Sequence, residues 1–386
     1  MHIKYILTHP IQYQAPLIKY LVKKGIKITV LYRSNFSTKE FFDTQFKKKI
    51  KWDIDLLKGY NYKFLNYIGP NKVTTFLPLT TDFYKNIFTD KTDIIWIHGI
   101  KSWYNLTIII LAKFRNKKVF VRDESHLLNR GIQKKRSLLN KLFNFVLFKF
   151  IDNFIDAYLA IGSINKKFYL SNKIKKDKIF YVPYTVDNNL FYKKKKIKKN
   201  KKIIFLYAGK FTHNKGADLL LKAIYNLNKN KNFLSNTKFI FIGDGEIKNE
   251  SVEFTKKKKI TNVKFFPFQK KYKDLIKFYH SSDVFILPSR FENWGLTINE
   301  AMAGENAIIC SEQCGASYDL VKNSVNGYTF KNSDIEDLSN KINLVFKFRN
   351  RINNFKKNSL KLILKWNFER CYNGLNKAIY YVSKNN

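Results

Sequence analysis

The sequence predicts an α/β protein made of two doubly wound domains that face each other across a cleft. Two observations predict this fold class. Short apolar strand patterns alternate with amphipathic helical patterns along the 386 residues, and a run of lysines divides that series into two halves. A length prior of about 150 residues per domain agrees with two or three domains. In such folds, ligands bind at the carboxyl ends of the parallel strands, commonly between domains.

The first half opens on an apolar run, residues 3–7, that is typical of a buried strand. A helical pattern follows over 14–24, with its apolar residues on one face and Gly25 as a stop. Helical stretches separate the next strand patterns, which predicts a parallel sheet covered on both faces. These later strands are expected at 28–32, 93–97, 118–122, 157–161 and 178–182.

Residues 193–202 read KKKKIKKNKK and predict a solvated linker, since such a run cannot pack. A second β-α-β series follows it. Its strands are expected at 203–207, 238–242, 263–266, 284–287 and 307–310, and its helices at 216–228, 272–280, 296–303 and 334–348. From Leu360 on, apolar residues repeat as one stripe of a terminal helix, with Gly374 as its weak point. The predicted units are 1–192, the linker 193–202, 203–350 and a helical segment 351–386.

The composition excludes several classes of protein. Its 35 Phe and 23 Tyr are too many aromatics for a disordered chain, and 3 Cys exclude a disulfide scaffold. We expect reduced thiols in a cytoplasmic protein, because the opening residues show no secretory signal and no apolar run reaches ~18 residues.

The charge is strongly basic, with 72 Lys and Arg against 29 Asp and Glu and a net charge of +43. Such a charge suits nucleic acid or an anionic membrane surface. Lys, Asn, Ile, Phe and Tyr are also encoded by A/T-rich codons, so biased composition is an alternative explanation. No helix-turn-helix, zinc or RNP-like pattern supports nucleic acid.

Two glutamates stand eight residues apart beyond the strand expected at 284–287. Glu292 lies in the loop at the carboxyl end of that strand, which is where open α/β sheets bind ligands. Glu300 completes a capping box in which Thr297 is the N-cap residue, so helix capping and ligand binding are both open for it.

A second loop, residues 208–216, runs from a strand into a helix. Gly209 lets the backbone turn, and Lys210 and Lys215 place two cations beside a helix N-terminus, where a pyrophosphate could be held. Two ordinary solvated lysines are the alternative. Gly243-Asp244-Gly245 closes another strand as a tight turn, and the D-x-D at 53–55 predicts a surface turn.

These motifs, in this order, resemble the retaining glycosyltransferases of family 4, which have the GT-B fold of two Rossmann-like domains. The resemblance rests on G-K-F-x-x-x-K-G at 209–216, G-D-G at 243–245, S-x-D-V-F-I-L-P-S at 281–289, the paired glutamates, E-A-M-A at 300–303 and N-G-Y at 326–328. The first half matches more loosely, through T-H-P-I-Q-Y at 8–13 and V-P-Y-T-V-D at 182–187.

The resemblance implies transfer of a sugar from a nucleotide sugar with retained anomeric configuration and without a metal or other cofactor. Lys210 and Lys215 would neutralise the diphosphate leaving group. Glu292 would hold sugar hydroxyls or face the developing oxocarbenium charge, and Glu300 would bind the ribose hydroxyls. The remaining donor-binding residues implied are Gly209, Gly243, Asp244 and the backbone of Asn293, Trp294 and Gly295.

The acceptor side is less defined by the sequence. Many relatives carry a catalytic His after a strand of the first domain, and His126 stands in that place here. Glu124, His98 and His9 are the other candidates on this side, and a structural hydrogen-bonding role is the alternative for each histidine. The chain departs from the family after E-A-M-A, where Gly304 is expected to form a shifted left-handed cap.

Residues 137–150 could form an amphipathic helix at a membrane interface. Their polar residues fall on one helical face, most of the remaining residues are apolar, and a basic run precedes them. An ordinary helix covering the first sheet is the alternative. The predicted function is therefore a cytoplasmic sugar transferase that builds a surface polysaccharide, lipid-linked glycan or glycoprotein. A peripheral position on the inner membrane face is left open. A basic nucleic-acid-binding protein and a GT-B protein that binds nucleotide sugars without transfer are the two rivals.

Overall fold

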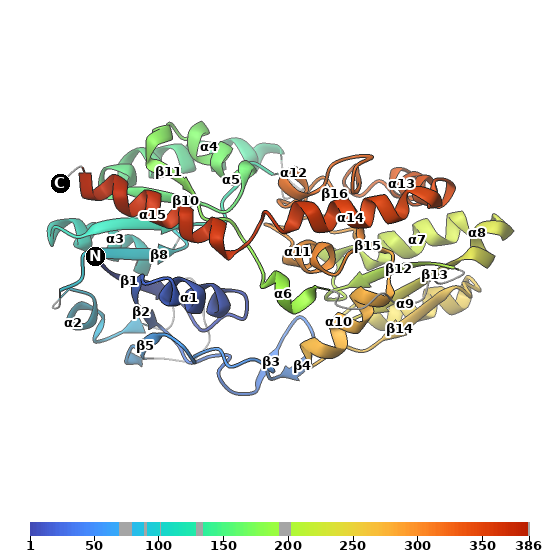
Figure 1. Ribbon diagram of the computed structural model, residues 1–386, viewed down its shortest axis with the longest axis horizontal. Coiled ribbons are helices and arrows are strands. Elements are labelled where there is room, and N and C mark those ends of the chain that lie inside the picture. The colour runs from blue at the N-terminus through green and yellow to red at the C-terminus, as the bar shows by residue number, and fades with distance from the viewer. Residues whose placement is uncertain (69–78, 89–90, 101, 129–133, 193–201, 385–386) are drawn as a thin grey trace.

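The computed structural model describes residues 1–68, 79–88, 91–100, 102–128, 134–192 and 202–384, and it leaves the side chains of residues 79 and 134–141 undescribed. The predicted linker 193–202 lies outside the described residues, apart from Lys202. Each half of the chain builds its own parallel sheet, and the two lobes lie side by side (Figure 1). The two doubly wound α/β units predicted from the sequence are confirmed.

The first sheet has seven strands among the described residues, in the order β11-β10-β9-β8-β1-β2-β5, and each strand pairs in parallel with its neighbours. The reversal of strand order between β1 and β8 marks the point where such sheets bind ligands. The strands are β1 (His2–Leu7), β2 (Lys27–Tyr32), β5 (Asn61–Phe64), β8 (Ile94–His98), β9 (Lys118–Arg122), β10 (Ala157–Ala160) and β11 (Ile179–Tyr181).

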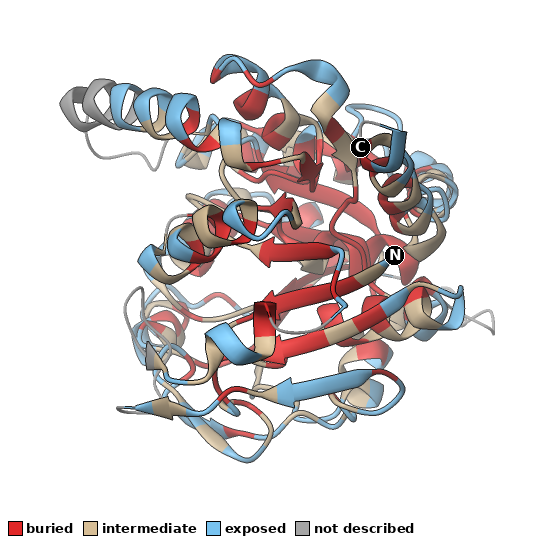
Figure 2. Ribbon diagram, turned by 90° about the vertical axis from the view of Figure 1, so that its left-hand side faces the viewer, coloured by how far each residue is buried: buried red, intermediate tan, exposed pale blue. Residues whose placement is uncertain are grey.

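Helices cover both faces of the first sheet, whose strands are buried along most of their length (Figure 2). One face packs against α1 (Gln14–Lys23) and the final helix α15 (Phe368–Lys384). The other packs against α2 (Phe83–Phe88), α3 (Trp103–Phe114), α4 (Lys134–Ile151) and α5 (Ser163–Ser171). The short helix α6 (Asn188–Phe191) lies between the two lobes, where it contacts α11 (Leu296–Ala303) (Figure 1).

The second sheet has six parallel strands among the described residues, in the order β14-β13-β12-β15-β16-β17. Numbered along this half, the order is 3-2-1-4-5-6, which is that of the Rossmann fold. Its reversal point lies between β12 and β15. The strands are β12 (Ile203–Ala208), β13 (Thr237–Ile242), β14 (Val263–Phe266), β15 (Val284–Leu287), β16 (Ala307–Ser311) and β17 (Gly327–Phe330).

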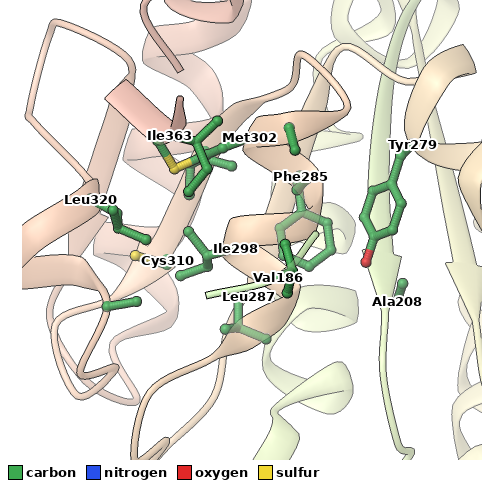
Figure 3. Close-up of a cluster of buried hydrophobic side chains, with 14 of the residues drawn as sticks. Val186, Ala208, Tyr279, Phe285, Leu287, Ile298, Met302, Cys310, Leu320 and Ile363 are labelled. Carbon is green, nitrogen blue, oxygen red and sulfur yellow. The ribbon is translucent and has the colours of Figure 1, made fainter. Parts of the chain in front are cut away.

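Two apolar layers cover this sheet. One includes α7 (Ala217–Leu227) and α13 (Ile335–Lys347). The other includes α10 (Tyr272–Ser281) and α11, which pack against Phe285, Leu287 and Cys310 of the sheet (Figure 3). The remaining helices are α8 (Lys231–Asn236), α9 (Lys248–Lys257), α12 (Ser317–Leu320) and α14 (Ile352–Ile363), with 3₁₀ turns at Asp152–Phe154, Lys176–Lys178, His213–Lys215 and Arg349–Arg351.

Six strands were not predicted. They are the edge strands β5 and β17 and two antiparallel pairs, β3 (Phe41–Asp43) with β4 (Lys48–Ile50) and β6 (Tyr67–Ile68) with β7 (Leu79–Thr80). Each of the six has four residues or fewer. In addition, β4 and β5 carry exposed polar residues, so they lack the unbroken apolar run by which the equally short β15 could be predicted.

The single terminal helix expected from Leu360 is wrong. The chain ends α14 at Ile363 and starts α15 at Phe368, because the Asn367 side chain accepts a hydrogen bond from the Arg370 N–H at 2.9 Å and so caps a new helix. Gly374 is not a weak point of α15. A Cβ atom there would lie 1.7 Å from the Tyr181 carbonyl oxygen, so glycine permits the close packing of α15 on β11.

Two expected helix caps around α11 are also wrong. The N-cap residue is Gly295 rather than Thr297, and its φ of 94° is a left-handed conformation that favours glycine. At the other end, Gly304 has φ −79° and Glu305 takes the left-handed conformation instead. Without the capping box, the Glu300 carboxylate is available for another contact.

Candidate functional site

A cavity of about 700 Å³ lies between the two lobes, at the carboxyl ends of the strands beside both reversal points. Residues from both halves line it. The lining includes Gln12, Tyr13, Glu124 and Tyr184 from the first half, and Gly209, Lys210, Gly243, Lys215, Glu292, Asn293, Trp294, Gly295 and Glu300 from the second. Most of the donor-side residues predicted from the sequence therefore share one cavity.

Lys215 and Glu292 form an ion pair at the centre of the donor side. Lys215 ends the 3₁₀ turn after β12, and Glu292 stands in the loop after β15. These loops meet because β12 and β15 are neighbours in the sheet. The Lys215 side chain is 25% exposed and that of Glu292 17%, so both charges face the cavity without being fully hydrated. A cation and a carboxylate are thus fixed beside each other where a ligand can reach both.

Lys210 contacts the first half of the chain. Its ammonium group donates to the Asp43 carboxylate at 3.1 Å and to Gln45 Oε1 at 2.7 Å. Gly209 continues the same loop, and its N–H donates to the Ile242 carbonyl at 3.0 Å, which holds this loop beside the one at Gly243. No local pattern in the sequence indicates the contacts with Asp43 and Gln45.

Asp244 is buried and does not line the cavity. It accepts hydrogen bonds from Lys248 at 2.5 Å, from Lys48 at 2.7 Å and from the Phe268 N–H at 2.9 Å. Burial acts to raise the pKa of Asp244, but these donors outweigh it and hold the pKa below its ordinary value. The residue therefore supports the donor side through its neighbours.

Glu300 is buried on α11, where the Tyr279 hydroxyl donates to its carboxylate at 2.8 Å. Burial raises the pKa of Glu300 to about 7, with the Tyr279 hydrogen bond acting in the opposite direction. Glu300 still lines the cavity, so its carboxylate could accept hydrogen bonds from the two hydroxyl groups of a vicinal diol. Its ionisation falls in the neutral pH range.

The segment from Asn293 to Gly295 leads into the N-terminus of α11. Among the described residues, its three N–H groups donate to no other backbone group. Its helix-start position suits phosphate or sugar oxygens. The Trp294 side chain is buried instead, stacking on Trp366 at a ring distance of 5.6 Å and donating to Asn299 at 2.9 Å.

On the acceptor side, Glu124 lines the cavity and His126 is not among the lining residues. Glu124 accepts hydrogen bonds from the Tyr184 hydroxyl and from Asn293 Nδ2, the latter at 2.7 Å. His126 Nε2 lies 3.3 Å from Asn293 Oδ1. Both first-half candidates thus meet the donor-side loop through the same asparagine.

The other two histidine candidates lie behind this surface. His98 is enclosed by Tyr5, Gln14 and Tyr184, with ring nitrogens 3.2 Å from the Tyr5 hydroxyl and 3.1 Å from that of Tyr184. Burial lowers the pKa of His98 to about 3, so it stays neutral and can support Tyr184. Burial likewise lowers the pKa of His9 to about 4, and neither histidine is among the cavity's lining residues.

Tyr13 and Tyr184 are cavity residues that the sequence reasoning did not select. Their hydroxyl groups lie 3.3 Å apart, and the Tyr184 hydroxyl donates a hydrogen bond to the Glu124 carboxylate. Both stand inside the two first-half motifs, T-H-P-I-Q-Y and V-P-Y-T-V-D, which could have drawn attention to them.

Asp55 accepts from the N–H groups of Leu57 and Lys58 and so forms the turn expected for the D-x-D segment. The segment is more than a surface turn, because Asp55 lines the cavity and Asp53 accepts a hydrogen bond from the Tyr272 N–H at 2.8 Å. In the described part of the chain, no group of three or more His, Cys, Asp or Glu residues could hold a metal ion. A search of the same residues found no helix with the length and hydropathy needed to cross a membrane.

Residues 188–362 match the model of a family described as "Glycosyl transferases group 1". The match covers the second sheet and the paired motifs around Lys215 and Glu292. This match supports the interpretation of the chain as a glycosyltransferase.

Curated relatives point the same way. The chain is 24% identical over 238 residues to an uncharacterised glycosyltransferase of Methanocaldococcus jannaschii, covering 58% of this chain and 65% of that protein. It is 28% identical over 197 residues to the α-1,4-N-acetyl-D-galactosaminyltransferase of Campylobacter jejuni whose name gives an undecaprenol-diphosphate-linked glycan, covering 51% of this chain and 52% of that protein. The matches thus span about half to two thirds of these relatives.

Among solved structures, HepE of Anabaena in complex with UDP aligns with a TM-score of 0.73 at 14% identity, covering 98% of this chain and 100% of that one. At this identity the likeness shows the fold. The two Rossmann-like domains are arranged as in GT-B glycosyltransferases.

Proposed function

We propose that this protein is a glycosyltransferase that moves a sugar from a nucleotide-sugar donor to a glycan, lipid-linked or protein acceptor, with retention of anomeric configuration. The observation that carries the proposal is the Lys215–Glu292 pair in a cavity shared with Lys210 and Glu300. The group 1 family match over the same half supports it.

On the donor side, each charged residue binds or faces a part of the nucleotide sugar. Lys215 and Lys210 bind the diphosphate, and their charge stabilises the leaving group most as the glycosidic bond breaks. The N–H groups of residues 293–295, which donate to no backbone group of the described residues, offer further donors to oxygen atoms. Glu292 accepts hydrogen bonds from sugar hydroxyls or faces the positive charge that develops at the anomeric carbon. Glu300 accepts hydrogen bonds from the ribose hydroxyls. No residue of this set needs a metal ion for its role.

The reaction breaks the bond between the anomeric carbon and the diphosphate oxygen and forms a bond from that carbon to an acceptor oxygen on the same face. The acceptor hydroxyl gives up its proton, and the departing phosphate oxygen is a base that can take it. Retention is proposed from the family resemblance of the motifs at 209–216 and 292–303.

On the acceptor side, Glu124 is a charged side chain that can accept a hydrogen bond from an incoming hydroxyl, since it lines the cavity beside Asn293 of the donor loop. His98 and Tyr184 fix its orientation. His126 helps to hold the Asn293 side chain, whose Oδ1 lies 3.3 Å from His126 Nε2. The named activity of the Campylobacter relative supports a glycan or lipid-diphosphate-linked acceptor.

The test is turnover with a panel of nucleotide sugars and polyprenyl-diphosphate-linked or free glycan acceptors, read by mass spectrometry and by NMR of the new anomeric centre. Transfer with the donor's anomeric configuration is the expected result. Binding of a nucleotide sugar without transfer to any acceptor would favour the non-catalytic alternative. Tight binding of RNA or DNA with steep salt dependence, and none of nucleotide sugars, would favour the nucleic-acid alternative.

We also propose that the enzyme works peripherally on the cytoplasmic membrane face, held there by α4. Phe148 and Ile151 of α4 are buried on the first sheet, but other apolar side chains of its described part are exposed (Figure 2). They include Leu142 at 60%, Phe143 at 62%, Val146 at 58% and Phe150 at 55% exposure. The helix sequence KKRSLLNKLFNFVLFKFI holds no acidic residue, which suits anionic lipid.

Vesicle sedimentation tests this localisation. Vesicles with anionic phospholipid should bind the protein at low salt, and a double Phe143→Ser, Val146→Ser variant should bind roughly tenfold more weakly or worse, because interfacial binding scales with buried apolar area. Equal binding of both proteins would exclude α4 as the contact, and absence of binding would exclude the membrane surface.

A further inference from the structure

A hairpin of the first half, β3 with β4, reaches across to the second lobe (Figure 1). Phe41 pairs with Ile50 and Asp43 with Lys48, so the turn between the strands holds residues 44–47. The hairpin belongs to neither large sheet. Phe41 packs against Phe36 and Trp52 of its own half, so contacts with both halves of the chain hold the hairpin in place.

The hairpin surrounds the ammonium group of Lys210. Asp43 Oδ2 lies 3.1 Å from that nitrogen and Gln45 Oε1 lies 2.7 Å from it. The same nitrogen stands 4.8 Å from the centre of the Phe46 ring. A carboxylate, an amide oxygen and a ring face thus gather around one cation.

Two further contacts fix the hairpin beside the donor side. The Phe46 ring packs against Phe268 at a centroid distance of 4.5 Å, and Lys48 donates to the Asp244 carboxylate at 2.7 Å. Phe46 is only 9% exposed, so the apolar contact is largely dry. Asp43, Phe46 and Phe268 all line the cavity.

The charges decide how this arrangement responds to a ligand. A diphosphate bound at Lys210 brings negative charge to the ammonium group that Asp43 already neutralises. The Asp43 side chain is 17% exposed, so its repulsion of a nearby diphosphate is only partly screened. Lys215 differs, because its partner Glu292 belongs to the same half of the chain.

We propose that the β3–β4 hairpin is a first-half component of the donor site, in which Asp43 competes with the donor diphosphate for Lys210, so that donor binding loosens the hold of the hairpin on the second half. The inference rests on the proposed function, since it takes a diphosphate-bearing donor as the ligand. Because coupling is reciprocal, weakening the Asp43 contact must strengthen diphosphate binding by the same factor. Asp43 is a positioning residue for Lys210.

Calorimetric titration with UDP and with inorganic pyrophosphate measures this competition. Asp43→Asn should bind both probes roughly two- to fivefold more tightly than the unaltered protein, the range expected for a partly exposed ion pair. Asp43→Glu keeps the charge and should stay near the original affinity. Glu40→Gln, an exposed site next to the hairpin, is the matched control and should show no change.

A Lys210→Ala background separates competition from a purely structural effect. In that background Asp43→Asn should no longer change the affinity, because the cation for which both groups compete is gone. Hydrogen exchange should also show faster exchange of residues 41–50 when UDP is bound. Circular dichroism and thermal unfolding establish that the variants are folded.

Weaker or unchanged probe binding by Asp43→Asn, or a gain that persists without Lys210, would overturn the inference. So would a hairpin whose exchange does not change when UDP binds. Failure of both probes to bind the unaltered protein would overturn it too, and the turnover assay then judges the glycosyltransferase proposal separately, because it reads product and needs no free nucleotide to bind.

Discussion

The two sides of the cavity differ in how they use charge. The donor side carries ammonium and carboxylate groups in ion pairs, with Lys215 on Glu292 and Lys210 on Asp43. The acceptor side carries hydrogen bonds between the neutral side chains of His98 and Tyr184, which lead to the Glu124 carboxylate at the cavity, and burial keeps His98 uncharged.

This difference suggests a division of work. Paired charges are suited to a ligand that brings its own charge, because a diphosphate can replace one carboxylate partner. A neutral network is suited to orienting a hydroxyl group, because its direction matters more than its charge. Variants of each side should therefore fail in different kinetic parameters.

The largest effect is expected for Glu292→Gln. It keeps the shape of the side chain and removes the charge that we propose faces the sugar hydroxyls or the anomeric carbon, so kcat should fall roughly 100- to 1000-fold. Steady-state kinetics and a thermal unfolding curve measure it. Glu253→Gln, on the exposed side of α9, is the control. A rate within about threefold of the original would break the donor-side assignment.

Lys215→Ala should lower kcat by roughly 100-fold, because the leaving diphosphate loses a fixed cation. Combined with Glu292→Gln the losses should be far from additive, since the two side chains are in contact. Lys222→Ala on the exposed face of α7 serves as the control. Strictly additive losses would mean that the pair does not act as a unit.

Glu124→Gln sharpens the comparison from the other side. It should lower kcat/KM for the acceptor roughly tenfold, the loss typical of a hydrogen bond to a charged group. The donor KM should stay nearly unchanged, because among the described residues Glu124 contacts the donor loop through the Asn293 side chain and not through Lys215 or Glu292. Initial rates at varied donor and acceptor concentrations separate the two constants, and a donor-only effect would contradict the division of work.

The smallest effect is a pH dependence of donor affinity. With a pKa of about 7, Glu300 becomes ionised between about pH 6 and about pH 8, and its carboxylate accepts hydroxyl hydrogen bonds better than the acid does. Donor affinity should therefore rise by roughly three- to tenfold over this range. Titrations of Glu300→Gln should be nearly flat. An equal rise in that variant would assign the dependence to another group.

The same group makes a stability prediction of known sign. Its pKa is raised above the ordinary value of 4.5, so folding favours the protonated form, and the associated stability is lost as the pH rises from about 4.5 through about 7. Glu300→Gln should unfold at a higher temperature than the original protein at about pH 8 and lose that advantage near pH 5. Scanning calorimetry at the two pH values checks it.

Most of the fold could be predicted from the sequence, because long parallel strands and their helices carry local patterns. The strand expected at 118–122 and the helix expected at 296–303 match β9 and α11 at both ends. The hairpin at 41–50 could not, since its strands are three residues long and are stabilised by contacts with Phe268 and Asp244, more than 190 residues away.

The candidate site was predictable where its residues sit in loops that follow strands. Lys215 and Glu292 were selected from such loops, and the structure pairs them. The Lys210–Asp43 contact joins positions 167 residues apart, and no local pattern reports it. For Glu300 the spacing left a capping box and ligand binding both open. The left-handed Gly295 starts the helix instead and leaves the carboxylate to Tyr279.

The central claim is that the cavity binds a nucleotide sugar through its diphosphate. Calorimetric titration of a series of nucleoside diphosphates and monophosphates against the original protein and Lys215→Ala tests it most directly. We predict that at least one nucleoside diphosphate binds, that its monophosphate binds at least roughly tenfold more weakly, and that Lys215→Ala removes this difference. Diphosphate binding that is unaffected by Lys215→Ala, or equal affinity for the monophosphate, would contradict the account.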